Sequence, residues 1–250
     1  MDVTKPATLT LVTNLLKEFV PLFPNSPVFH IGDDEYPYLD QMSACPDLVA
    51  CANANAKGHV ADVFVNFVND LNKVVTGLGR KTEIWNWWDE VGGNTIQPAK
   101  DIIIEGWKGD TSKYTNDGYE AVSRPESKLY VTPGLNTQPN TSDLYSTWAP
   151  STAAGLDGYE VDVWADGWQD KSDAYFDWYL RRPREVAAGR TVADLRLQPH
   201  RRAALAHPLV SRTESHAGPR RDRRGAAPDR TSFATRCGPG VTSQATRLPE

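Results

Sequence analysis

The stretch PVFHIGDDEYPY (residues 27–38) passes within a few positions from apolar residues to three adjacent carboxylates, which are followed by tyrosines. Its first residues predict a short buried strand, and Gly32 lets the backbone bend where the acids begin. Successive side chains of a strand point to opposite faces, so Asp34 and Glu35 can face one ligand only where the strand gives way to a turn. The stretch therefore indicates either a pair of catalytic acids at the carboxyl end of a strand or a solvated acidic turn.

Helices and strands alternate along the chain around this stretch. Apolar spacing predicts helices over residues 6–20, 60–75, 114–122 and 172–189, further strands over 82–88, 101–107, 129–132 and 158–167, and a loop over 40–58. Such alternation favours a parallel sheet with helices outside and function at the carboxyl ends of the strands. The fold class is α/β, and a doubly wound sheet is one option. We favour an incomplete (β/α)8 TIM barrel of about the last five strand-helix units, because aromatic or acidic residues end each strand.

The composition changes sharply near residue 190. All eight Trp and all nine Tyr precede position 181, whereas residues 195–250 contain eleven Arg, no Lys and four acidic residues in a chain of net charge −5. We therefore expect a partial barrel domain over residues 1–190 and a disordered tail, rich in Arg, Ala, Pro and Gly, over residues 191–250. An out-of-frame reading of a GC-rich gene would explain this tail. A basic tail that binds nucleic acid is the less favoured alternative, because its charges lack interleaved aromatic residues.

Several classes of function find no support in the sequence. No run of about 18 apolar residues could span a membrane, and the start MDVT (residues 1–4) does not open a signal peptide. The chain has no G-x-G-x-x-G motif, and residues 77–82 miss the spacing of a phosphate-binding P-loop. The histidines show no metal-ligand spacing. We therefore expect no metal, no cofactor, no nucleic-acid partner and no membrane partner.

Tryptophans end several of the predicted strands, at Trp85, Trp107 and Trp164. Aromatic rings with carboxylates and amides between them suit a pyranose, which has one apolar face and hydroxyls around its edge. Burial in the barrel core is the alternative for any single tryptophan. Their recurrence at three strand ends favours a sugar site for the set.

The segment HIGDDE (residues 30–35) resembles the H-x-G-G-D-E signature of glycoside hydrolase family 20, which comprises β-N-acetylhexosaminidases and lacto-N-biosidases. The later segments are similar in order to those of the family, and the resemblance covers residues 1 to about 190. Trp85 and Trp107 resemble the tryptophans that wall the family's −1 subsite. The segment Trp164-Ala165-Asp166 resembles its W-x-E segment, whose acid holds sugar hydroxyls.

Residues 129–148 resemble the family segment whose tyrosine and aspartate contact the acetamido group and its surroundings. The resemblance implies that Asp143 and Tyr145 bind substrate, although their order here is Asp-Leu-Tyr instead of Tyr-Leu-Asp. His30 is also a candidate, either supporting the acid pair through hydrogen bonding or as a satisfied core histidine.

The resemblance implies substrate-assisted retaining hydrolysis of glycans that carry β-linked N-acetylglucosamine, N-acetylgalactosamine or lacto-N-biose. Glu35 would be the general acid that protonates the glycosidic oxygen. The carbonyl oxygen of the substrate's own 2-acetamido group would be the nucleophile, and Asp34 would accept the N–H of that group.

Departures from the family pattern define the alternative. Asp33 replaces the second glycine of the signature and is expected to face away from the ligand, and Asp166 is one methylene shorter than the family's glutamate. The family's barrel has three earlier strand-helix units, so an inactive or merely sugar-binding fragment is the second interpretation. If the parent enzyme is secreted, as many relatives are, Cys45 and Cys51 could form a disulfide, and free thiols are the alternative. The localisation and the oligomeric state of this chain stay open.

Overall fold

The computed structural model describes residues 1–196 except 133–138, 165, 168 and 170, so most of the expected tail lies outside the described residues. Its helices are α1 (Pro6–Phe19), η1 (Val20–Leu22), α2 (Leu39–Ser43), α3 (Pro46–Asn55), α4 (Val60–Gly77), α5 (Trp87–Val91), α6 (Ser112–Asn116), α7 (Glu126–Leu129), α8 (Thr141–Ser146) and α9 (Asp173–Arg196). Its strands are β1 (Val28–His30), β2 (Lys81–Trp85), β3 (Ile103–Gly106), β4 (Ala121–Ser123), β5 (Tyr130–Val131), β6 (Leu156–Tyr159) and β7 (Asp162–Val163).

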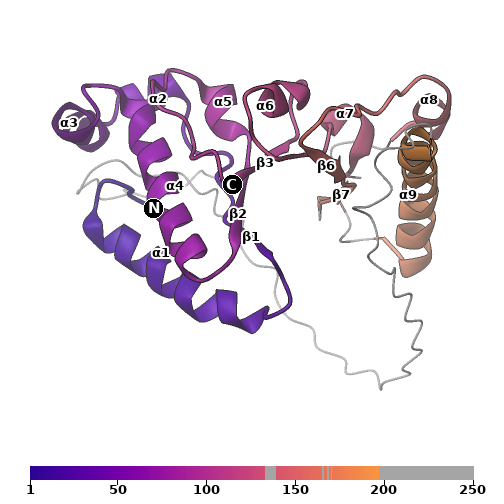
Figure 1. Ribbon diagram of the computed structural model, residues 1–250, viewed down its shortest axis with the longest axis horizontal. Helices are drawn as coiled ribbons and strands as arrows, with labels where there is room; N and C mark the ends of the chain where they lie inside the picture. Colours follow the sequence, from indigo (N-terminus) through magenta and orange to yellow (C-terminus); the bar gives the residue numbers. More distant parts are fainter. Residues whose placement is uncertain (133–138, 165, 168, 170, 197–250) are drawn as a thin grey trace, which may run out of the picture.

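The strands form an all-parallel arrangement. Five of them make one sheet in the order β1-β2-β3-β4-β6, and β5 pairs with β7 in a second sheet. Figure 1 shows α1 and α4 beside β1 and β2, and α8 and α9 together at the other end of the sheet. Among the described residues β1 and β6 each have one paired neighbour, so the sheet does not close on itself. The α/β class and the incomplete barrel are confirmed.

One face of the large sheet packs against helices. The other face carries polar and aromatic side chains. Val65 and Val68 of α4 pack in a buried cluster with Ile84 of β2 and Ile104 of β3. The two-residue period of a strand places Glu83, Trp85 and Glu105 on the opposite face, where the parallel register sets Trp85 beside Glu105.

The boundaries of helix α4 agree closely with those of the helix predicted over residues 60–75. Its buried side chains recur at helical spacing, from Val60 through Val63 and Phe64 to Val75. It ends where Gly79 adopts a φ of 77°, which allows its N–H to donate to the carbonyl of Thr76 at 2.9 Å. The strand that follows can therefore return to the sheet at once.

The predicted loop over residues 40–58 was wrong, because it contains α2 and α3. Pro46 stands at the first position of α3, where its missing N–H costs no hydrogen bond, and Leu48 and Ala52 are buried on one side of that helix. Cys51 is a free thiol, so the suggested disulfide between Cys45 and Cys51 is also wrong.

The second half of the chain corrects several predicted boundaries. The helix predicted to reach residue 122 ends with α6, because Gly118 has a φ of 87° and the chain then enters β4 between β3 and β6. The strand predicted over residues 158–167 is divided between β6 and β7, which belong to different sheets. The strand predicted over residues 82–88 ends at Trp85, where α5 follows. Among the described residues, no helix combines the length and the apolar character that crossing a membrane requires.

Candidate active site

Aromatic side chains from several strand ends lie together in one group. Trp85 ends β2, Trp107 follows β3, Tyr130 lies in β5 and Trp164 follows β7. Each ring contacts the next, with centroid distances of 4.9 Å for His30–Trp85, 6.0 Å for Trp85–Trp164, 5.9 Å for Trp164–Tyr130, 6.2 Å for Tyr130–Trp107, 5.9 Å for Trp107–Trp87 and 5.1 Å for Trp87–Tyr38. These residues are called the aromatic cluster. Trp87 and Tyr130 are buried, whereas Tyr38 and Trp164 are exposed, so part of the cluster faces solvent.

Residues 32–35, called here the acid turn, leave the end of β1 in an unusual backbone conformation. Gly32 has a φ of 87°, and the non-glycine residues Asp33 and Glu35 have φ values of 80° and 52°. Non-glycine residues in this region cost of order 1 kcal/mol or more each and cluster at functional sites. The carbonyl of Gly32 accepts a hydrogen bond from the N–H of Trp85 at 3.0 Å, which attaches the turn to β2.

The three acids of the turn occupy different environments. Asp34 and Glu35 are exposed, whereas Oδ2 of Asp33 is buried without a hydrogen-bond partner. Burial raises the pKa of Asp33 well above its ordinary value, and burial together with the charge of Glu35 raises the pKa of Asp34. Asp33 is thus set apart from the two exposed acids.

The acid turn acts electrostatically on the aromatic cluster. Burial lowers the pKa of His30, and the charge of Asp34 is among those that oppose this shift. Burial also raises the pKa of Tyr130, and Asp34 contributes to that shift as well. Because such interactions weaken with distance, Asp34 lies within electrostatic range of both His30 and Tyr130, which contact Trp85 and Trp164 respectively.

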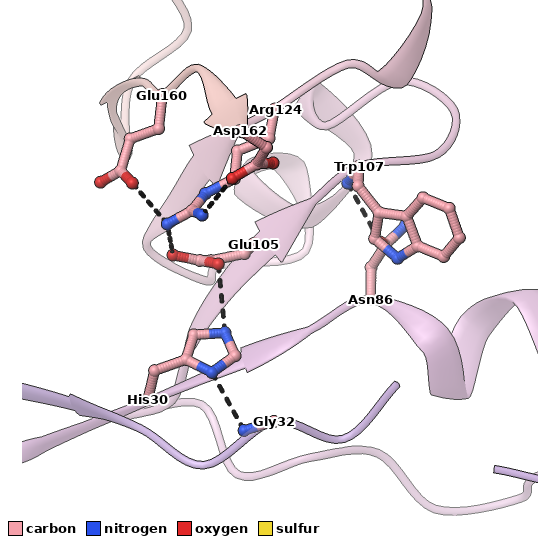
Figure 2. Close-up of polar contacts among 8 residues, drawn as sticks. All are labelled: His30, Gly32, Asn86, Glu105, Trp107, Arg124, Glu160 and Asp162. Carbon is pink, nitrogen blue, oxygen red and sulfur yellow. Dashed lines mark hydrogen bonds and ion pairs between the residues drawn. The ribbon is translucent and has the colours of Figure 1, made fainter. Parts of the chain in front are cut away.

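A charge network lies beside His30, which belongs to the aromatic cluster (Figure 2). Arg124, which follows β4, forms ion pairs with the carboxylates of Glu105, Glu160 and Asp162, and its Nη1 donates to Oδ1 of Asp162 at 2.7 Å. The Glu105 side chain is completely buried, and its Oε2 lies 3.1 Å from Nε2 of His30. Residues in or next to five strands, β1, β3, β4, β6 and β7, are therefore joined through one guanidinium group and one carboxylate.

Two glutamates in this region have raised pKa values. Burial raises the pKa of Glu83 to about 8, and the adjacent charge of Glu105 and a hydrogen bond with it add to the shift. Burial also raises the pKa of Glu105 to about 7, although the bond from Glu83 and the charge of Arg124 oppose this. A protonated Glu83 that donates to an ionised Glu105 fits these directions.

A buried amide fixes the backbone of a cluster tryptophan. The N–H of Trp107 donates to Oδ1 of Asn86 at 3.1 Å (Figure 2). The Asn86 Nδ2 group donates to the carbonyl of Lys108 at 3.0 Å and to the hydroxyl of Tyr114 at 2.9 Å. Trp87, directly after Asn86, donates from its ring N–H to the carbonyl of Tyr36 at 2.8 Å. Hydrogen bonds therefore fix the backbone of Trp107 and the ring of Trp87, which stack on each other in the cluster.

The structure brings together most of the sequence-predicted site residues. His30, Trp85, Trp107 and Trp164 belong to the aromatic cluster, and Asp34 and Glu35 lie in the acid turn that leaves β1. Asp166 is exposed in the turn that follows Trp164.

Asp143 and Tyr145 lie apart from this group. Both belong to α8, which packs against α9. Asp143 forms an ion pair with Lys128, and the Tyr145 side chain is 72% exposed. Tyr130, from the same segment of sequence, stands in the aromatic cluster between Trp107 and Trp164.

Sequence reasoning missed Tyr130 and the charge network as site residues. The signal for Tyr130 was available, because this tyrosine lies in a predicted strand, as Trp85 does. The local sequence gives no signal for Glu105 and Arg124, since their roles depend on contacts between strands. The two residues are 19 positions apart in sequence. Among the residues that the structure describes, no three His, Cys, Asp or Glu side chains are grouped so as to hold a metal ion.

Comparison with known families gives a match over most of this region. The family model described as "Glycosyl hydrolase family 20, catalytic domain" matches residues 1–181. The chain belongs to this family. The family 20 match covers the acid turn, the aromatic cluster and the charge network alike.

Individual relatives share moderate identity with this family 20 chain. It is 26% identical over 182 residues to a lacto-N-biosidase from Bifidobacterium bifidum, with 66% of this chain and 16% of that protein covered. It is 29% identical over 184 residues to the β-hexosaminidase subunit A1 of Dictyostelium discoideum, with 66% and 32% covered. The chain thus spans less than a third of the length of either curated relative.

Solved structures share the fold. A family 20 exo-β-N-acetylglucosaminidase from Vibrio harveyi, solved in complex with N-acetylglucosamine, superposes with a TM-score of 0.63 at 18% identity, with 76% of this chain and 32% of that chain covered. A β-N-acetylhexosaminidase from Bacteroides fragilis gives a TM-score of 0.58 at 18% identity, with 76% and 40% covered.

Proposed function

We propose that this family 20 domain hydrolyses terminal β-linked N-acetylhexosamine by a substrate-assisted, retaining mechanism. The observation that carries the proposal is the acid turn, which presents adjacent exposed carboxylates, Asp34 and Glu35, at the end of a strand whose last residue contacts the aromatic cluster. The names of the relatives support the substrate class, since they include a β-hexosaminidase and a lacto-N-biosidase.

The roles divide by position. Glu35 acts as the general acid that protonates the glycosidic oxygen. The carbonyl oxygen of the substrate's acetamido group attacks the anomeric carbon, and Asp34 accepts the N–H of that group and stabilises the cyclic cation that forms. Adjacent acids suit this scheme better than double displacement, in which the two carboxyl groups flank the bond about 5 Å apart.

The aromatic cluster supplies the surface for the sugar ring. Trp85, Trp107 and Trp164 would contact its apolar face and edges, and Asp166 would bind hydroxyls from the turn that follows. Tyr130 takes the place proposed for Tyr145, because Tyr130 is stacked among the tryptophans whereas Tyr145 is exposed on α8. Asp143 is held by Lys128 and is the weakest member of the proposed set.

An inactive sugar-binding fragment is the second candidate, and the open sheet favours it. Hydrolysis of a chromogenic β-N-acetylglucosaminide and binding of a thiazoline that mimics the cyclic intermediate distinguish the two. An active enzyme turns over the first compound and binds the second, whereas a binding fragment shows binding without turnover. A chain that neither hydrolyses nor binds would contradict both.

The role of Glu35 has its own test. Glu35→Gln should lower turnover of an unactivated glycoside by about 10²- to 10⁴-fold, and by less for a substrate with a good leaving group. Glu18→Gln, at an exposed position on α1, is the matched control. Unchanged turnover in Glu35→Gln would remove Glu35 from the mechanism.

A further inference from the structure

The charge network is larger than the proposed chemistry requires. Arg124 is 14% exposed and Glu105 is fully buried, so both groups have lost most of their hydration. Well-packed apolar side chains at such positions are often as stabilising as a buried ion pair, so stability alone is weak grounds for one. The proposed steps of hydrolysis use neither residue. Their contacts toward the acid turn and the aromatic cluster suggest what they do.

The first line of contacts runs from Arg124 to the acid turn. Arg124 pairs with Glu105, and Oε2 of Glu105 lies 3.1 Å from Nε2 of His30 (Figure 2). On the other side of the ring, Nδ1 of His30 accepts a hydrogen bond from the N–H of Gly32 at 3.0 Å. Gly32 is the first residue of the acid turn. An accepting Nδ1 carries no proton, so the ring proton of neutral His30 stands on Nε2, which lies beside Oε2 of Glu105 without hydrogen-bonding to it.

The second line of contacts runs from the same cation to the aromatic cluster. The guanidinium carbon of Arg124 lies 5.0 Å from the ring centroid of Trp85, within the range of a cation–π interaction. The edge of the His30 ring packs against Trp85 with centroids 4.9 Å apart. Arg124 and His30 thus both contact the ring of Trp85, and both lie beside the carboxylate of Glu105.

We infer that Arg124 and Glu105 are positioning residues, which hold His30 in its Nε2–H tautomer and Trp85 in place so that the acid turn and the sugar-binding surface keep a fixed relative geometry. This inference rests on the proposed function of that site. Neither residue touches the reacting atoms. Substituting either residue should therefore change the position of Trp85 and the tautomer of His30, and any effect on hydrolysis should follow from those changes.

The wild-type protein gives the first test, without any variant. The ¹⁵N shifts of the His30 imidazole, assigned by comparison with His30→Gln, should show a protonated Nε2 and an unprotonated Nδ1 when the ring is neutral. A proton on Nδ1 would overturn the inference, because the bond from Gly32 would then be impossible. This readout does not need the chain to hydrolyse anything, so it separates failure of the inference from failure of the proposed function.

Two variants give the second test. Glu105→Gln keeps the shape of the side chain but removes the charge that faces both His30 and Arg124. Arg124→Lys keeps the charge but loses the planar fork that serves several carboxylates at once. Each should shift His30 toward a mixture of tautomers and weaken thiazoline binding by roughly 10- to 100-fold, the scale of a misplacement of about 1 Å.

The chain offers a matched control for buried charge. Asp62 on α4 is a buried carboxylate that accepts hydrogen bonds from the N–H and hydroxyl of Thr95, both at 2.6 Å. Asp62→Asn should destabilise the fold while leaving the His30 tautomer unchanged. If Glu105→Gln and Arg124→Lys resemble Asp62→Asn in both the tautomer and the thiazoline affinity, the network is only structural and the inference is wrong.

Discussion

The backbone N–H of Trp107 donates to the side-chain oxygen of Asn86, and the same buried amide donates to Lys108 and Tyr114. Asn86 therefore satisfies three polar groups that belong to the next strand-helix unit. Asn86→Ala should lower the free energy of unfolding by about 2 kcal/mol or more, because it leaves buried donors and acceptors without partners.

Urea unfolding followed by tryptophan fluorescence measures this loss. Asn55→Ala is the control, since that amide is exposed on α3 and, within the described part of the chain, donates to the carbonyl and the sulfur of Cys51. Equal stability losses in the two variants would show that the bonds of Asn86 are individually weak.

The contributions of Tyr130 and Tyr145 to ligand binding can be compared by removing one hydroxyl group at a time. Tyr130→Phe keeps the stacked ring but removes a polar group from the proposed sugar surface, and thiazoline affinity should fall about 3- to 10-fold, the value of one hydrogen bond. Tyr145→Phe should leave the affinity unchanged, because that side chain is mostly exposed on α8. Isothermal titration calorimetry on both variants decides between them, and the reverse ranking would restore Tyr145 to the site.

Trp164 should matter more for binding than for folding. Its side chain is 36% exposed, yet its ring contacts those of Trp85 and Tyr130. Trp164→Ala should weaken thiazoline binding by up to about 10-fold, on the scale of one aromatic contact, with a small change in stability. Trp178→Ala on α9 is the control, because Trp178 is exposed and its ring contacts among the described residues are with Tyr175 and Tyr179 of the same helix. Comparable affinity in the two variants would argue against a sugar surface at Trp164.

The raised pKa of Glu83 predicts how stability depends on pH. Its value of about 8 in the fold, against an ordinary 4.5, means that the folded chain retains a proton which the unfolded chain releases. The stabilisation by this group is complete below the ordinary pKa and is lost as the pH rises toward about 8. Glu83→Gln stays uncharged, so its stability relative to the wild type should increase from about pH 5 to about pH 8.

Thermal unfolding at several pH values measures this difference. Glu18→Gln, the same substitution at an exposed position on α1, is measured alongside as the control. A constant difference for Glu83→Gln would mean that Glu83 ionises in the fold as it does in water.

The sequence predicted those parts of the site that depend on local pattern. The apolar residues before Gly32 predict the strand that precedes the acid turn, and Gly32 predicts where that strand ends. The tryptophans at strand ends also follow from local sequence pattern. The division of residues 156–163 into β6 and β7 could not be predicted, since it reflects pairing with β4 and β5 far away in sequence. Helices α2 and α3 were missed because both are short and gain much of their stability from burial.

The charge network lay beyond prediction for a related reason. Glu105 reads locally as a polar residue inside an isoleucine-rich strand, and Arg124 reads as part of a turn before Pro125. Only the parallel register sets the Glu105 carboxylate where it can meet both His30 and the guanidinium. The role of a buried charge is decided by its neighbours in space.

The contacts of Arg124 also constrain the order in which this chain can fold. His30 and Glu105 are 75 positions apart, and Arg124 joins them only after β2, β3 and β4 have docked in parallel, each through a crossover. Pairing between such distant segments must overcome loop-closure entropy, which makes it slow. A nascent chain that has formed only β1 therefore contains the acid turn but lacks the contacts from β3 and β4 that would position it. Ligand binding at this site should consequently appear late in refolding, after most helical signal has returned.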